Sequence, residues 1–237
     1  MPWLCQSCTG QAAEPIAASA SLEAQRPTPV VGYRVSYEGR QMGYHCADWI
    51  VARIEDTGDV ISSCGDYELK LSAAYDFNPV SLVTRDGRAL MEFFPYAPTI
   101  RFPLKVDQRW HGQYRMKAPD LGIDADVRAA CRVASYEEIE IPAGRLPAFR
   151  IDCVDRLQMG PREMRTHTTR WYAPEAAAFV KSEQLEDPAN WDFVVTHFGM
   201  GSPDIQAAGP APSASPPPPV NGADLDALAP VLDPDAY

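Results

Sequence analysis

Residues 137–156 read EEIEIPAGRLPAFRIDCVDR, two strand-like segments on either side of Pro142-Ala143-Gly144. In both segments apolar residues alternate with polar ones, which is the period of a β-strand with one buried face. Gly144 supplies the left-handed residue that a short loop between antiparallel strands requires. The stretch therefore predicts a long hairpin with a three-residue connection, in place of a catalytic loop or a metal site.

The two arms of this hairpin keep their apolar residues on one parity, so we expect that parity to face the core. The predicted inward set is Val127, Ala129, Cys131, Val133, Ile139 and Ile141 on the first arm, and Phe149, Ile151 and Cys153 on the second. With a three-residue connection, Cys153 lies opposite Val133 and diagonal to Cys131. The two cysteines are therefore expected to be neighbours on one buried face.

The same alternation recurs through residues 30–198. Tyr33, Val35 and Tyr37 alternate with polar residues, and turn signals occur at Asp56-Thr57-Gly58 and Arg85-Asp86-Gly87-Arg88. No segment keeps apolar residues at the spacing of a core helix. Short strands separated by turns predict an all-β domain, built as a single curved antiparallel sheet or half-barrel.

Composition divides the chain into three parts. Residues 1–29 are small, polar and proline-containing and are expected to form a disordered leader. Residues 30–198 are predicted to form the antiparallel β domain. Residues 199–237 are rich in proline and alanine and acidic, and the segment AAGPAPSASPPPPV at 207–220 is typical of an extended linker, so we expect a disordered tail.

The net charge of the chain limits the classes of partner that it is expected to bind. The net charge is −11, from 21 basic and 32 acidic residues, which disfavours binding to nucleic acid or to anionic membrane surfaces. No apolar run is long enough for a transmembrane helix. The start, MPWLCQSCTG, lacks the basic and apolar regions of a secretory signal. LCQSC is also compatible with the remnant of a lipoprotein signal that begins upstream, with Cys5 or Cys8 as the lipidation candidate.

The six cysteines leave two interpretations open. Cys5-x-x-Cys8 with His45-Cys46 does not have the spacing of a zinc site, and no second C-x-x-C is present, so no metal is predicted. The cysteines of the β domain are either buried free thiols or form one or two disulfides. We favour Cys46–Cys64 and Cys131–Cys153, which would place the protein in an oxidising, extracytoplasmic compartment.

The residues that usually carry catalysis do not form a recognisable set. The histidines follow no metal or triad pattern, and no nucleophile elbow or phosphate loop occurs. Glu137-Glu138 and Asp152 with Asp155 are candidates for an acid–base pair, but Glu138 and Asp152 fall on the parity expected to face water. No catalytic residue and no cofactor are predicted. A hydrolase that uses an unrecognised carboxylate or histidine, such as His111, His167 or His197, remains the alternative.

Large aromatic residues recur in the predicted strands. They either fill the core or line an apolar pocket on the concave face of the sheet, and the sequence does not separate these roles. The candidate pocket residues are Trp49, Trp110, Tyr114, Phe149, Trp171 and Trp191.

Three segments together resemble one family. FPLKVDQRW at 102–110, VASYEEIEIPAGRLPAFRID at 133–152 and TRWYAPEAAAFVKSE at 169–183 are similar, in this order, to motifs of the TapB-like bacterial envelope proteins associated with type IV pili. Two turns depart from the motifs: Asp107 stands where glycine is usual, and Glu175-Ala176-Ala177-Ala178 replaces a glycine-containing turn. The resemblance implies a half-barrel or curved sheet, an extracytoplasmic location and no established catalytic residues.

These observations favour a non-catalytic envelope module that binds an apolar ligand, a peptide or a protein partner. A purely structural partner-binding protein, tethered by the proline-rich tail, is a further alternative to the hydrolase.

Overall fold

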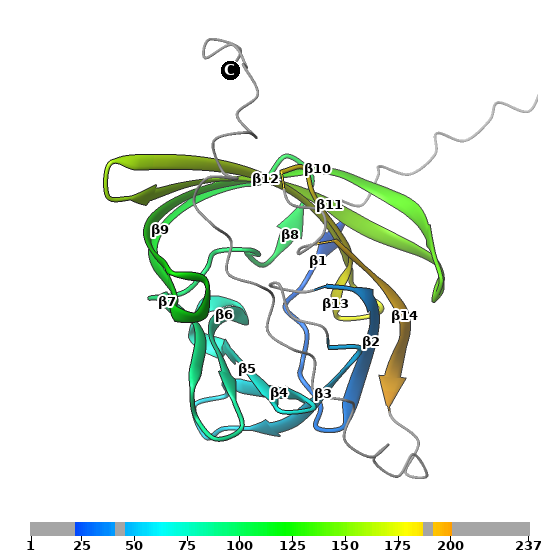
Figure 1. The fold of residues 1–237 in the computed structure, drawn as a ribbon. Coiled ribbons are helices and arrows are strands. Elements are labelled where there is room, and N and C mark those ends of the chain that lie inside the picture. Colours follow the sequence, from blue (N-terminus) through cyan, green and yellow to red (C-terminus); the bar gives the residue numbers. More distant parts are fainter. Residues whose placement is uncertain (1–21, 41–45, 187–191, 201–237) are drawn as a thin grey trace, which may run out of the picture.

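Figure 1 shows strands along most of the described chain, which comprises residues 22–40, 46–186 and 192–200 of this computed structural model. Two 3-10 turns, η1 (Ala73–Tyr75) and η2 (Pro119–Leu121), separate some of the strands. The strands are β1 (Glu23–Ala24), β2 (Tyr33–Gly39), β3 (Asp48–Ile54), β4 (Val60–Cys64), β5 (Tyr67–Ser72), β6 (Asn78–Thr84), β7 (Ala89–Phe94), β8 (Leu104–Lys105), β9 (Arg109–Ala118), β10 (Ile123–Ile141), β11 (Gly144–Met159), β12 (Arg162–Ala173), β13 (Ala178–Gln184) and β14 (Phe193–Met200).

Twelve of the described strands form a closed antiparallel barrel in the order β10-β11-β12-β13-β14-β2-β3-β4-β5-β6-β7-β9. Its closure depends on β2 and β14, which run side by side from Tyr33↔Met200 to Gly39↔Phe193 (Figure 1). The all-β prediction is confirmed, but the expected open sheet or half-barrel is wrong. Pairing between the first and last barrel strands satisfies the backbone groups that an open sheet would leave unpaired at its edges.

The β10–β11 hairpin has a tighter connection than the sequence predicted. Ile141 pairs with Gly144, so only Pro142 and Ala143 connect the strands. A register shift between Val133 and Ser135 then moves the first arm by one further residue. Cys131 consequently lies directly opposite Cys153, whereas the predicted register placed Val133 there.

This β-bulge also divides the apolar residues of the first arm between two cores. An extra residue on one strand reverses which parity faces a given side of the sheet. Cys131 and Val133 lie in one buried cluster, while Ile141 lies in another, against which the partly buried Ile139 packs. The expectation of one buried face along the whole arm is therefore wrong.

Three apolar clusters stabilise the barrel, and we name them by position. The central cluster comprises Trp49, Cys64, Leu82, Leu90, Met91, Phe93, Ala97, Met116, Ala118, Ala125, Val127 and Leu157. The disulfide cluster comprises Ala24, Ile100, Leu104, Trp110, Cys131, Val133, Phe149, Ile151, Cys153 and Tyr172. The hairpin-tip cluster comprises Val35, Ile141, Leu146, Ala148, Trp171, Ala173, Ala176, Val180 and Val195.

The chain leaves the barrel between β7 and β9, which pair with each other. In this excursion, β8 pairs with β1 to form a separate two-stranded sheet. β1 lies within residues 1–29, the segment expected to be a leader; residues 22–29 of that segment are described and 1–21 are not. Within the described ranges, no helix is long and apolar enough to cross a membrane.

Candidate functional site

The predicted pocket residues do not converge. Trp49 lies in the central cluster, Trp110 and Phe149 in the disulfide cluster, and Trp171 in the hairpin-tip cluster. All four are buried, so they fill cores. Tyr114 is only partly buried and packs against the central cluster. Trp191 lies outside the described residues.

Hydrogen bonds of two of these tryptophans support a structural role. Trp110 Nε1 donates to the Pro98 carbonyl oxygen at 2.8 Å, and Trp171 Nε1 donates to Glu137 Oε1 at 2.8 Å. The bonds from Trp171 and Ser135 hold the pKa of the Glu137 carboxyl below its ordinary value. A tryptophan whose N–H is occupied by the protein is anchored in place, with no polar atom left for a ligand.

Both favoured disulfides are present. Cys46–Cys64 joins the segment before β3 to the end of β4, with 6.0 Å between the Cα atoms. Cys131–Cys153 joins β10 to β11, with 4.1 Å between the Cα atoms. Cys5 and Cys8, the lipidation candidates, lie outside the described residues.

The loop at 95–101 crosses the inner side of β9 beside the Cys131–Cys153 disulfide. A Cβ atom at Gly112 would lie 2.4 Å from Cγ of Pro98, so glycine is needed for this close approach. Asn78 fixes the loop: its side-chain oxygen accepts from the backbone N–H groups of Thr99 and Ile100 at 2.7 and 2.9 Å. The loop thus covers the inner wall at one level of the barrel.

Next to this loop, three strands bring polar side chains to the inner face. They are Tyr114 on β9, Asp155 on β11 and Arg170 on β12, which we call the interior polar cluster. Strand register aligns them with the buried neighbours Val127, Ala129 and Ile151, respectively. Because directly opposed residues share a face, all three side chains lie on the apolar side of the sheet.

Burial is the largest influence on the pKa of each group. It raises the pKa of the Tyr114 hydroxyl well above its ordinary value, and the charge of Asp155 adds to this. Burial also raises the pKa of Asp155, although the Arg170 charge and the hydrogen bond from Tyr114 lower it. Burial lowers the pKa of Arg170, which Asp155 opposes. All three nevertheless keep some exposed surface.

A small hollow of about 10 Å³ adjoins this cluster, room for roughly one water-sized group. It is lined by Ala97, Pro98, Thr99, Tyr114, Ala129, Cys131, Cys153, Asp155 and Arg170. The hollow therefore lies between the 95–101 loop and the inner wall, beside the disulfide.

A larger hollow of about 270 Å³ lies by the same loop, lined by Ala74, Tyr75, Asp76, Asn78, Tyr96, Pro98, Ile100, Arg101, Trp110 and His111. Tyr75 and Tyr96 stack at its edge, with ring centroids 4.2 Å apart. Asn78 hydrogen-bonds the loop's backbone, and Asp76 accepts from the backbone N–H of Phe102 directly after the loop. These polar groups are therefore engaged in holding the loop, which makes this hollow a weaker candidate than the interior polar cluster.

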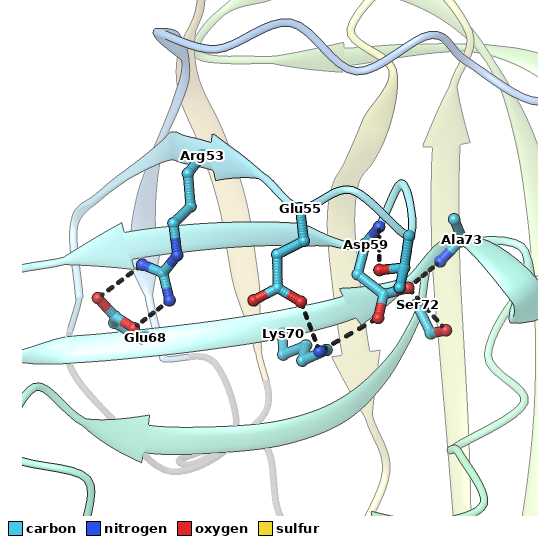
Figure 2. A network of polar contacts seen from close by, with 8 residues as sticks. Arg53, Glu55, Asp59, Glu68, Lys70, Ser72 and Ala73 are labelled. Carbon is cyan, nitrogen blue, oxygen red and sulfur yellow. Dashed lines mark hydrogen bonds and ion pairs between the residues drawn. The ribbon is translucent and has the colours of Figure 1, made fainter.

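Figure 2 shows a separate polar network on β3, β5 and the turn between β3 and β4. Arg53 forms a bidentate ion pair with Glu68, with N–O distances of 3.1 and 3.2 Å. Lys70 Nζ contacts Glu55 at 2.7 Å and Asp59 at 3.1 Å. Each of these charges has an opposite partner, so the network stabilises the sheet and leaves no unpaired group for chemistry.

The candidate acid–base groups are dispersed. His111 and His197 are exposed on β9 and β14, and His167 on β12 contacts Glu186. Asp152 accepts hydrogen bonds from Thr169 and Arg150, and Glu138 is exposed beside Arg145. His45 lies outside the described residues. Among the residues that the structure describes, no group of histidine, cysteine or acidic side chains has the arrangement of a metal site.

The interior polar cluster was partly visible in the sequence. Asp155 shares the parity of Phe149, Ile151 and Cys153, so strand alternation alone directs it inward. Arg170 lies in the polar segment RTHTTRW, where no apolar alternation marks the inner face. Its position follows only from the pairing of β12 with β11.

Comparison with known proteins gives similarity of shape alone. No family model matches the sequence, and no curated protein matches it significantly. The TapB-like resemblance is therefore not confirmed. The hypothetical lipoprotein YmcC of Escherichia coli is 13% identical, with a TM-score of 0.48 over 73% of this chain and 89% of that one.

Two further solved structures are similar. A candidate exported protein of Bacteroides fragilis with a YmcC-like fold is 14% identical, with a TM-score of 0.42 over 74% of this chain and 99% of that one. A candidate lipoprotein of Parabacteroides distasonis is 10% identical, with a TM-score of 0.41 over 74% and 99% of the respective chains. These values are too low to transfer a function.

Proposed function

We propose that the protein is a non-catalytic extracytoplasmic module whose barrel interior binds a ligand with an apolar body. The observation that carries the proposal is a set of apolar side chains that pack against the central cluster but remain only partly buried. They are Tyr37, Tyr67, Leu69, Tyr114, Ile123, Met159 and Met164. In a filled core such side chains would be fully covered, so their residual exposure supports a contact surface for a ligand.

Two disulfides support the extracytoplasmic part of the proposal. Structural disulfides form and persist in oxidising compartments and are rare in the cytosol. Lipid attachment at Cys5 or Cys8 belongs to the same proposal. Mass spectrometry of the N-terminal peptide from the native protein tests it: a diacylated cysteine is expected, and an unmodified peptide that retains Met1 would contradict it.

The hydrolase alternative has less support. Its histidine candidates His111, His167 and His197 lie on three different strands, and two of them are exposed. General acid–base catalysis requires such groups within hydrogen-bond reach of one substrate position.

Binding of the fluorescent probe phenylnaphthylamine tests the proposed function. The probe should bind to the full chain, and Leu69→Gln should weaken binding because it places an amide on the proposed contact surface. Leu185→Gln is the matched control, since Leu185 is 75% exposed. Absence of probe binding, together with no co-purified small molecule in native mass spectrometry, would overturn the proposal.

A further inference from the structure

Arg170, a member of the interior polar cluster, lies beside an aromatic ring. Its guanidinium carbon lies 5.9 Å from the centroid of the Phe179 ring, a cation–π contact. None of the hydrogen bonds or ion pairs found in the described ranges engages its guanidinium group. A guanidinium carries five N–H donors and stays protonated, so leaving them unused inside a protein is costly.

Asp155 is not a hydrogen-bond or ion-pair partner of the Arg170 guanidinium. It interacts with Arg170 through its charge, but the two do not form a direct ion pair. The Asp155 carboxylate instead accepts a hydrogen bond from the Tyr114 hydroxyl. The charge of Asp155 nevertheless favours the protonated form of Arg170.

The wall around Arg170 is also polar. Register pairs Arg170 with Ser182, and Thr168 with Gln184, on the neighbouring strands β12 and β13. All three neighbours are buried residues with polar side chains, and no hydrogen bond of the described ranges uses their side-chain atoms. Polar side chains that surround an arginine and are not hydrogen-bonded to other protein groups are suited to binding an anion that supplies several acceptors.

We propose that Arg170 binds the anionic head group, a carboxylate or a phosphate, of a single-chain amphiphile held in the barrel. This inference rests on the proposed function and names the class of its ligand. The guanidinium fork matches the paired oxygens of either head group. The adjoining hollow, about 10 Å³, has room for roughly one water-sized group, so only an oxygen of the head group enters it. The proposal places the chain of the amphiphile along the partly buried apolar residues that pack against the central cluster.

The test compares ligands that share a chain and differ in the head group. Laurate, dodecyl phosphate and the neutral ester methyl laurate are titrated into the full chain by calorimetry. At least one anionic ligand should bind about tenfold or more tightly than the ester, since a hydrogen bond to a charged group is worth about a factor of ten or more. Preference between laurate and dodecyl phosphate identifies the head group, and either preference supports the proposal.

Variants assign the effect to the residue. Arg170→Gln should remove the preference for the anionic ligands while leaving the affinity for methyl laurate unchanged. Arg156→Gln, an exposed arginine on β11, is the matched control and should keep the preference. If Arg170→Gln does not fold, the titrations of the unaltered chain still test whether the protein prefers anionic ligands to the neutral ester.

The outcomes separate the two claims. Equal affinity for laurate, dodecyl phosphate and methyl laurate would overturn the role of Arg170 and leave the proposed function standing. Absence of binding by all three would overturn both claims. An anion preference that survives Arg170→Gln would place the head group elsewhere and contradict the inference.

Discussion

The Tyr114 hydroxyl on β9 hydrogen-bonds the Asp155 carboxylate on β11, across the intervening strand β10. This contact links two strands that are separated by β10 on the inner side of the barrel. It also fixes the nearest negative charge to Arg170, on which the proposed ligand site depends.

Removal of this hydroxyl should destabilise the fold. In Tyr114→Phe the buried Asp155 loses its donor, and an unsatisfied buried polar group costs about 1–3 kcal/mol of unfolding free energy. Urea unfolding measures the loss. Tyr75→Phe, at a residue that is 39% exposed, is the control and should change stability little. Equal effects of the two substitutions would contradict the buried hydrogen bond.

The pH dependence of stability should report on Asp155. Burial raises its pKa in the folded state above the ordinary value of an aspartate. The folded state therefore binds the proton more tightly, and this contribution is present at low pH and lost as the pH rises through the folded pKa. Relative to Asp155→Asn, the unaltered chain should lose unfolding free energy between acid and neutral pH. Parallel pH profiles of the two chains in urea unfolding would refute the raised pKa.

Asp59 should show the opposite dependence. Desolvation raises its pKa, but hydrogen bonds from Ala73, Lys70 and Ser72 together hold it below 3.8 (Figure 2). Its contribution is then present above the unfolded pKa and lost as the pH falls through the lower, folded value. Asp59→Asn should cost about 1–3 kcal/mol at neutral pH and less in acid.

The more exposed ion pair on the same strands is the control for Asp59. Glu68→Gln, which weakens only the contact with Arg53, should cost about 0–1 kcal/mol. Thermal unfolding at neutral pH and in acid separates the two variants. A loss for Asp59→Asn that is no larger than for Glu68→Gln would contradict the network of Figure 2.

The two turns that depart from the TapB-like motifs keep a left-handed backbone. Asp107 has φ 66° and Ala177 has φ 48°. Residues with a Cβ atom are strained there by about 1–2 kcal/mol, and glycine is not. Ala177→Gly should therefore raise the melting temperature. Asp107→Gly should gain less, because it also removes the 2.6 Å ion pair with Arg132. A lower melting temperature for Ala177→Gly would show that the turn is not left-handed in solution.

Parts of this fold can be predicted from local sequence. The β10–β11 hairpin shows which features can be predicted in this way and which cannot. Alternation and the Pro-Ala-Gly segment were sufficient for the hairpin, its inward cysteines and the favoured disulfide pairs. They did not predict the bulge between Val133 and Ser135, because the residues before and after the bulge are both typical of a β-strand. One unpaired residue was enough to shift the register and to send Ile141 to a different core.

Closure of the barrel could not be predicted from local sequence for a related reason. Alternating strands have the same pattern in an open sheet and in a closed one. The pairing that distinguishes them joins Tyr33 to Met200, at opposite ends of the domain. For the candidate site, parity directs Asp155 inward, but the uncommitted state of Arg170 depends on contacts between strands and leaves no mark in the sequence.

The most direct test of an internal ligand site is a titration with laurate of the protein labelled at its methionine methyl groups. The methyl signals are recorded by nuclear magnetic resonance at each step of the titration. Met159 and Met164 pack against the central cluster and remain partly buried, whereas Met200 is 60% exposed. If laurate binds inside the barrel, the Met159 and Met164 methyl signals shift saturably and the Met200 signal is unchanged. Unchanged signals at Met159 and Met164, or a shift confined to Met200, would contradict an internal ligand site.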